Sequence, residues 1–353
     1  MTRQTAFIGT YTDGPSDGIY TCEIFPNRNP VVRDRGCNHV SDNPSFLTIH
    51  PDNRHCYAVH EVEDGGVTAF TIERDDRELQ SLGRVDTGIR GPCHCSIHPS
   101  GAFLFVAHYT GAAVSVLPIL DDGSLGPPSD TVSHDGYSVE PARQTHAHPH
   151  SITPGPDGRF LYVPDLGTDE ILIYELNDED GTLAQIGAHA TEPGAGPRHL
   201  ALHPAHQYVY VINELNSTLS AFERNPETGH LSEINTESTL PSAFDGENIT
   251  ADVHVHPSGR WVYGSNRGHN SIAIFEIDET TGQITSVGHE STRGEWPRNF
   301  AIDPTGQLLF AENQETNTIV AFHIDKEKGT LSHTGDVLSV PEPVCMQILQ
   351  ADS

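Results

Sequence analysis

The chain has 353 residues, in which 49 aspartates and glutamates outnumber 19 lysines and arginines and give a net charge of −30. A field of this sign repels nucleic acids and anionic membrane surfaces, so neither is expected as a partner. Because the sequence has no apolar run of membrane-spanning length and no signal-like start, we expect a cytoplasmic protein.

Lysine is nearly absent, since only Lys326 and Lys328 occur. Such an acidic excess indicates adaptation to concentrated salt, where a Debye length of about 3 Å at 1 M screens self-repulsion. An ordinary acidic cytosolic protein is the alternative. The six cysteines are scattered, which is typical of buried thiols rather than a disulfide framework. Cys93 and Cys95 lack a second pair at zinc-site spacing, so we expect neither a metal nor a cofactor.

The N-terminal residues predict three β-strands, TAFIGTYT, GIYTCEIF and a segment near Val31 to Cys37. From residue 45 a unit then recurs six times. It consists of a short apolar strand, a turn with proline, a second and a third apolar strand, and a fourth strand near a Gly-x-Leu or related turn. The turn prolines are Pro51, Pro99, Pro156, Pro204, Pro257 and Pro304. Four strands in about fifty residues are typical of a propeller blade.

The C-terminal segment PVCMQIL matches the first strand of this unit, and the three N-terminal strands match its second, third and fourth. Both chain ends therefore complete a shared seventh blade, which leaves no open sheet edge in the ring. We predict an all-β fold, a seven-bladed β-propeller of four-stranded blades, as a single domain over residues 1–353.

In such a blade the start of the first strand and the end of the second lie on the same face, close to the axis of the ring. Polar residues at the starts of first strands are Cys93, His94, His150, Arg198, His199, Asp252, His254, Arg298 and Asn299. Those that end second strands are His60, Glu61, His108, Tyr109, Asp165, Asn213, Glu214, Asn266, Arg267 and Asn313. This predicts a ligand site at one mouth of the ring. On the far face we expect turn and packing roles for His50, His98, His203 and His256.

The guanidiniums of Arg198 and Arg267 suit a carboxylate, a phosphate or a developing oxyanion, although they also hold loops through carbonyl groups. Glu214 is either their counter-ion or an acid/base residue, and His150 is a candidate acid/base or oxyanion donor. A zinc site formed by His150 with two preceding histidines is disfavoured, because Pro149 interrupts their spacing. Further substrate contacts are expected from His94, His199, Asn213, His254, Asn266 and Arg298.

The motifs GPRH, NELNS and ADVH followed by SNR, with FIGTYT near the N-terminus, resemble the lactonase family of seven-bladed propellers along essentially the whole chain. This family includes propeller-type 6-phosphogluconolactonases and the fungal carboxymuconate-lactonizing enzyme. The resemblance implies a metal-independent enzyme that opens or closes a lactone ring. The active-centre residues proposed for the carboxymuconate enzyme fall by motif on His150, Arg198, Arg267 and Glu214, which strand position had already selected.

Our leading hypothesis is hydrolysis of a sugar-acid lactone, with 6-phosphogluconolactone as the first candidate. Arginine would stabilise the oxyanion, Glu214 or His150 would take the proton from water, and a remaining arginine or Arg298 would bind a phosphate or carboxylate. An unphosphorylated sugar lactone is a variant of this hypothesis. The alternatives are cyclisation of an unsaturated dicarboxylic acid, and a non-catalytic propeller that binds protein or peptide.

Overall fold

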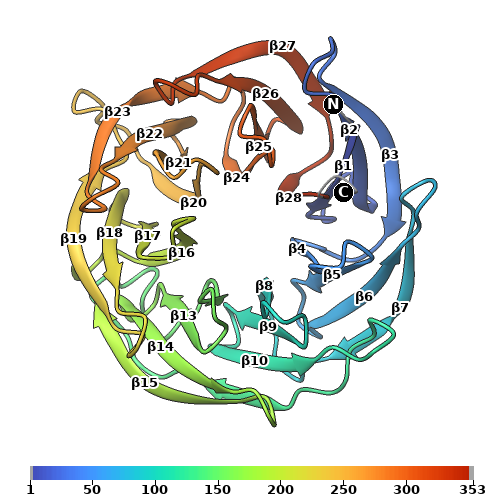
Figure 1. Cartoon of the computed structure of the whole chain (residues 1–353), viewed down its shortest axis with the longest axis vertical. Coiled ribbons are helices and arrows are strands. Elements are labelled where there is room, and N and C mark those ends of the chain that lie inside the picture. Colours follow the sequence, from blue (N-terminus) through green and yellow to red (C-terminus); the bar gives the residue numbers. More distant parts are fainter. Residues whose placement is uncertain (1–2, 350–353) are drawn as a thin grey trace.

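The computed structural model of the chain describes residues 3–349. Its strands form seven four-stranded antiparallel sheets arranged as a ring (Figure 1). This confirms the predicted all-β, seven-bladed propeller. The ends of the expected domain, residues 1–2 and 350–353, lie outside the described residues. No helix among the described residues has the length and apolar character needed to cross a bilayer.

The strands of each blade are given from the axis outward. Blade 1 contains β28 (Pro343–Ile348), β1 (Gln4–Thr10), β2 (Gly18–Ile24) and β3 (Val32–Val40). Blade 2 contains β4 (Phe46–Ile49), β5 (His55–His60), β6 (Gly66–Ile72) and β7 (Leu79–Asp86). Blade 3 contains β8 (Pro92–Ile97), β9 (Phe103–His108), β10 (Ala113–Pro118) and β11 (Asp130–Ser133). Blade 4 contains β12 (Thr153–Pro154), β13 (Phe160–Asp165), β14 (Glu170–Asn177) and β15 (Thr182–Ala190).

The remaining three blades follow the same order along the chain. Blade 5 contains β16 (Pro197–Leu202), β17 (Tyr208–Asn213), β18 (Thr218–Arg224) and β19 (Leu231–Ser238). Blade 6 contains β20 (Ile249–Val255), β21 (Trp261–Arg267), β22 (Ser271–Ile277) and β23 (Ile284–Ser291). Blade 7 contains β24 (Pro297–Ile302), β25 (Leu308–Asn313), β26 (Thr318–Ile324) and β27 (Leu331–Ser339).

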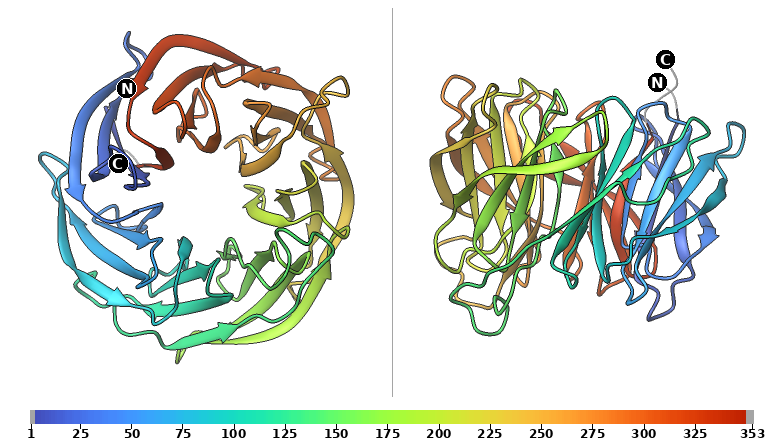
Figure 2. Two further views of the ribbon diagram at one scale, coloured as in Figure 1. Left: turned by 180° about the vertical axis from the view of Figure 1, so that it is seen from behind. Right: turned by 90° about the horizontal axis from the view of Figure 1, so that it is seen from below.

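Both chain ends meet in blade 1, as the sequence predicted. Strand β28 pairs antiparallel with β1, in a register that runs from Ala6 opposite Ile348 to Gly9 opposite Cys345. Figure 2 shows the red C-terminal strand next to the blue N-terminal strands in one blade of the ring. The backbone N–H of Leu47 in blade 2 donates to Cys345 Sγ at 3.3 Å, so the C-terminal strand also contacts the next blade.

The hydrophobic core lies between the blades. Successive residues of a strand point to opposite faces of its sheet, so Phe7 packs toward blade 2 while Ile8 packs toward blade 7. Since both faces of each inner sheet are covered, the second and third strands are buried at nearly every position. The outer strands face solvent on one side, and β19 accordingly has one buried residue, while its other residues are partly buried or exposed.

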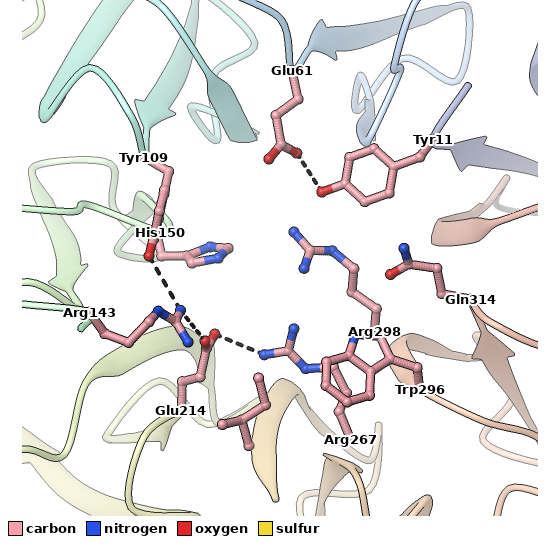
Figure 3. A pocket seen from close by; sticks show the side chains of 11 residues that line it. Tyr11, Glu61, Tyr109, Arg143, His150, Glu214, Arg267, Trp296, Arg298 and Gln314 are labelled. Atoms are coloured by element: carbon pink, nitrogen blue, oxygen red, sulfur yellow. Dashed lines mark hydrogen bonds and ion pairs between the residues drawn. The ribbon is translucent and has the colours of Figure 1, made fainter. Parts of the chain in front are cut away.

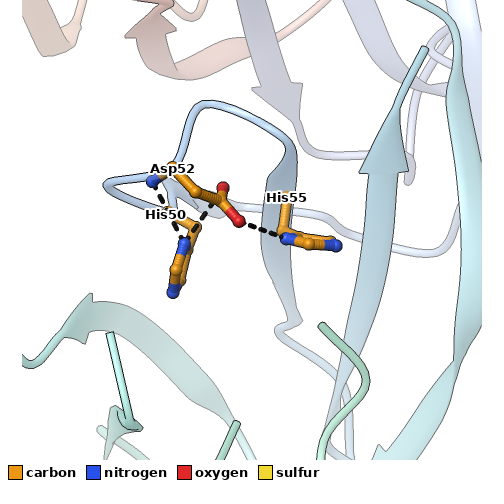
Figure 4. A group of neighbouring side chains, drawn as sticks. All are labelled: His50, Asp52 and His55. Atoms are coloured by element: carbon orange, nitrogen blue, oxygen red, sulfur yellow. Dashed lines mark hydrogen bonds and ion pairs between the residues drawn. The ribbon is translucent and has the colours of Figure 1, made fainter. Parts of the chain in front are cut away.

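Histidines beside the turn prolines join their own blade to the next one at the far face, which confirms their predicted role in the turns. His50, His203 and His256 each place Nε2 at 2.9 to 3.1 Å from a glycine carbonyl of the following blade. His50 also lies with Asp52 and His55 in a compact group (Figure 4). Its Nδ1 accepts a hydrogen bond from the backbone N–H of Asp52, so both of its ring nitrogens have protein partners.

Prolines explain two departures from the repeated pattern. In blade 3 the segment DGSLG forms an isolated bridge between Leu125 and Ile119, and the fourth strand β11 begins only at Asp130. Two prolines stand between, and proline cannot donate a hydrogen bond to a β-ladder. In blade 4 the first strand, β12, has two residues and follows Pro149 in a segment where regular pairing is interrupted.

Candidate active site

A recurring proline and β-bulge orient side chains at one mouth of the ring. In β16, Pro197 pairs with Asn213 and His199 pairs with Ile212, so Arg198 between them has no partner in the ladder. The same register shift follows Pro92 in β8 and Pro297 in β24. A bulge leaves the extra residue unpaired and redirects its side chain. The bulged residues are Cys93, Arg198 and Arg298, and His150 follows Pro149 at the equivalent place in blade 4.

A pocket of about 290 Å³ lies at this mouth (Figure 3). Its lining residues come from the starts of first strands or just before them and from the ends of second strands, except for Arg143, which lies further back in the loop between β11 and β12. They are Tyr11, Glu61, Tyr109, Arg143, His150, Glu214, Ile249, Arg267, Trp296, Arg298 and Gln314. The pocket is strongly polar and is close to the lower limit of size for a small-molecule site.

Glu214 is buried at one wall of the pocket and is surrounded by three guanidiniums. Arg143 donates to its Oε1 at 2.6 Å, while Arg198 Nε and Arg267 Nη2 each lie 2.9 Å from its Oε2. Burial raises the pKa of this carboxyl, but the charges of Arg267, Arg198 and Arg143 outweigh burial and lower the pKa to about 2. Glu214 is therefore ionised at neutral pH, and both of its oxygens have cationic partners.

Arg198 is held from behind by a chain of buried hydrogen bonds. Its Nη1 donates to the Ala251 carbonyl at 2.5 Å and to His199 Nε2 at 3.1 Å. His199 in turn donates from Nδ1 to Asp252 Oδ1 at 2.8 Å. Burial and the charge of Arg198 lower the pKa of His199 to about 4, so it is neutral and retains the acceptor nitrogen that this chain requires. The guanidinium is thereby fixed against Glu214.

His150 lines the pocket and contacts the rings of Tyr109 and His199. Its ring contacts the Tyr109 ring edge to face at 5.2 Å, and its Nδ1 lies 3.8 Å from Cys93 Sγ. Burial, followed by the charge of Arg198 and the neighbouring His199, lowers its pKa well below the ordinary value for histidine. His150 is therefore a neutral imidazole at physiological pH.

The opposite wall is formed by blades 1, 2 and 7. The Tyr11 hydroxyl donates to Glu61 Oε2 at 2.8 Å, and the Arg298 guanidinium lies over the Tyr11 ring at 5.3 Å. In the described part of the chain, Arg298 has no hydrogen bond and no ion pair within 4 Å. Arg267 differs, because it donates to the Thr250 carbonyl at 2.6 Å and packs against Trp296.

The structure brings together four of the predicted site residues, His150, Glu214, Arg267 and Arg298, as lining of one pocket. Arg198 contacts Glu214 but does not line the pocket.

The other five predicted substrate contacts do not line the pocket either. Asn213 donates to two hydroxyls of its own blade, and Asn266 donates to the Thr239 carbonyl. His94 stacks on Phe46, His199 contacts Asp252, and His254 donates to Asp252 from further along β20.

The sequence analysis did not name some of the lining residues, and it named others at the mouth of the ring without assigning them a role. Glu61 and Tyr109 were among the residues that end second strands, and the same rule locates Tyr11 after β1 and Gln314 after β25. Arg143 belongs to the insertion before β12, which the long spacing between Pro99 and Pro156 indicated. No pattern in the sequence indicates that the Arg143 side chain points into the pocket.

The three histidines before β12 do not converge on one point. His148 stacks on Tyr109 with ring centroids 4.2 Å apart and hydrogen-bonds to the Tyr109 carbonyl, whereas His150 lines the pocket. His146 packs on His148 with ring centroids 4.0 Å apart, and among the described residues the three histidines do not form a group of converging metal-ligand atoms.

Comparisons with known proteins match the seven-bladed ring over nearly the whole chain. The family model described as "Lactonase, 7-bladed beta-propeller" matches residues 5–348. The chain is 37% identical over 350 residues to a Bacillus subtilis protein named 6-phosphogluconolactonase, with 99% of each chain covered. A Formosa agariphila protein of the same name is 34% identical over 84% of this chain and 86% of its own. The structure of a Pseudomonas aeruginosa periplasmic gluconolactonase superposes with a TM-score of 0.93 at 30% identity, covering 99% of both chains.

Proposed function

The chain belongs to the lactonase family of seven-bladed β-propellers, and from this membership we propose that it hydrolyses a sugar-acid lactone, with 6-phosphogluconolactone as the substrate. Two similar proteins carry the name 6-phosphogluconolactonase, and one of them matches the chain over nearly its full length. A third is named a gluconolactonase, so the names of these similar proteins differ in whether the substrate carries a phosphate.

The observation that carries the proposal is the uncompensated positive charge of the pocket. Three arginines line it against two glutamates, and Arg198 adds a fourth cation directly behind Glu214. Arg298 in particular has no anionic partner within 4 Å in the described residues. A free, planar guanidinium in a pocket of an otherwise acidic protein suits a phosphate that it binds by two parallel hydrogen bonds. Such hydrogen bonds act at about 3 Å. The carboxylates elsewhere on the surface lie further away, and at physiological salt their field is screened over a Debye length of about 8 Å, so the nearby arginine dominates.

The proposed roles follow from these partners. Arg298 binds the phosphate of the substrate. Arg267 lines the pocket, and its guanidinium is the donor that stabilises the oxyanion formed when water attacks the lactone carbonyl. His150, a neutral imidazole, contributes one N–H donor to the substrate. Glu214 pairs with Arg198 and also contacts Arg143 and Arg267. Its role is therefore to hold these guanidiniums in place.

The test is a pH-stat assay of the purified protein on 6-phosphogluconolactone, gluconolactone and carboxymuconate, with spontaneous hydrolysis subtracted. We expect turnover of the phosphorylated lactone. Arg298→Met should raise its KM about tenfold to a hundredfold, the range for losing a charged hydrogen bond of about 1.5–3 kcal/mol, with little change for gluconolactone. Arg293→Met is the matched control, since Arg293 is an exposed arginine of the loop that precedes β24. Conversion confined to muconate would overturn the hydrolase assignment, and no turnover of any of the three would favour a binding protein.

We also propose that the protein acts in the cytoplasm and on a small molecule alone. All six cysteines are free, which suits a reducing compartment. One similar protein is named periplasmic, so fractionation of the producing cells, with activity measured in each fraction, is the deciding measurement. Activity released with the periplasmic fraction would overturn this location.

A further inference from the structure

The pocket has two glutamates, and their surroundings suit them to different tasks. Glu214 has a guanidinium at each oxygen, as described above, so neither oxygen is available to a water molecule. Glu61 lies across the pocket at the end of β5 and is only partly buried (Figure 3). Its single side-chain partner is the Tyr11 hydroxyl, which occupies Oε2. Within the described residues no lysine or arginine lies within 4 Å of Glu61, and its Oε1 has no partner.

Tyr11 is suited to hold Glu61 rather than to react. Burial, opposed in part by Arg298, raises the pKa of Tyr11 far above neutral pH, so the phenol remains protonated and donates its hydrogen. The donation engages one carboxylate oxygen and fixes the orientation of the other. Tyr11 follows β1 and Glu61 follows β5, so two adjacent blades position the pair independently of the Glu214 cluster.

His150 is a weaker candidate for accepting a proton. Its lowered pKa arises from burial and from the charges of Arg198 and Arg298, which also oppose formation of the imidazolium that proton abstraction would produce. A general base needs a lone pair that faces the substrate and a stable protonated form. In this pocket the free oxygen of Glu61 satisfies the geometric condition.

We propose that Glu61 is the general base of the lactone hydrolysis and that Tyr11 is its positioning residue, an inference that rests on the proposed function. The carboxylate takes one proton from water as the water oxygen bonds to the lactone carbonyl carbon. The carbonyl electron pair moves to oxygen, where Arg267 stabilises the charge. The bond between that carbon and the ring oxygen then breaks, and the ring oxygen takes the proton from Glu61. The products are one carboxylate and one hydroxyl after the acid ionises, and Glu61 is regenerated.

The test compares Glu61→Gln and Tyr11→Phe with wild type on 6-phosphogluconolactone and on gluconolactone. Glu61→Gln should lower kcat by about 10²–10⁴-fold, with KM nearly unchanged, because an amide of the same shape cannot accept the proton. Tyr11→Phe should lower kcat about tenfold, the effect of losing one positioning hydrogen bond, again without a rise in KM. Glu63→Gln, an exposed carboxylate of the same loop, should leave both constants unchanged.

Chemical rescue separates loss of a base from loss of structure. Glu61→Ala leaves space in the pocket, and added formate should restore a saturable part of kcat there but none in Glu61→Gln. Active wild type together with an equally active Glu61→Gln, or no formate rescue of Glu61→Ala, would overturn the role of Glu61 and leave the proposed function intact. Wild type without activity on either lactone would overturn both.

Discussion

At the residue scale, Glu312 is the least expected side chain of the molecule. It lies on β25 with no exposed surface, and neither of its carboxyl oxygens has a hydrogen-bond partner. Burial and the charge of Asp252 raise its pKa well above 4.5, so the carboxyl is protonated in the folded protein at pH values where it is ionised in the unfolded chain. The folded state binds the extra proton, and stability must therefore fall as pH rises above 4.5.

Glu312→Gln should remove this dependence. In wild type, Glu312 lowers the free energy of unfolding by about 1.4 kcal/mol for each pH unit between 4.5 and the pKa of its carboxyl in the folded protein. A neutral amide at this position does not titrate. The variant is expected to be more stable than wild type at pH 7, with the difference shrinking to near zero at pH 4.5. Denaturant unfolding from pH 4.5 to 8 measures this, with the exposed Glu315→Gln as control. A variant less stable than wild type at pH 7 would contradict the explanation.

At the scale of elements, the turn after each first strand connects neighbouring blades. The His203 imidazole lies 2.9 Å from the Gly259 carbonyl of the next blade, and Gly259 has a φ of +79°. A Cβ on Gly259 would lie 2.6 Å from His203 Nε2. Glycine is required there for two reasons, backbone conformation and close approach of the ring.

Gly259→Ala compared with Gly88→Ala separates these two reasons. Gly88 has a similar φ of +71°, but nothing lies within 4 Å of its added Cβ. Both variants should lose about 1–2 kcal/mol from the left-handed conformation, and Gly259→Ala should lose about 1–3 kcal/mol more because the imidazole is displaced from its carbonyl. Denaturant midpoints of the purified variants measure the difference. Equal losses would show that the inter-blade contact contributes nothing.

At the scale of the whole molecule, the net charge of −30 opposes the closed ring. Salt should weaken this repulsion, because the Debye length falls from about 10 Å at 0.1 M to about 3 Å at 1 M. We expect the melting temperature to rise steeply in the first molar of KCl and then to level off, since screening saturates. Calorimetry from 0.1 to 3 M KCl tests the expectation. A melting temperature that stays constant or falls as KCl increases would contradict salt adaptation.

The amino-acid sequence by itself determined the ring, its blades and the mouth at which polar residues gather. These follow from local alternation, from turns and from a unit repeated along the chain, so no long-range information was needed. The same strand-end rule selected Glu61 and Arg298, and it extends to Tyr11 and Gln314.

Only the tertiary structure decided what each of these side chains contacts. Arg198 lies behind Glu214 instead of in the pocket, Arg143 reaches the same carboxylate from an insertion, and Tyr11 rather than an arginine binds Glu61. The partners come from different blades. The number of residues between them follows no repeat, so the sequence does not indicate which side chains pair. Charge pairing depends on distances of a few ångströms, which side-chain packing and bulges set and residue order does not.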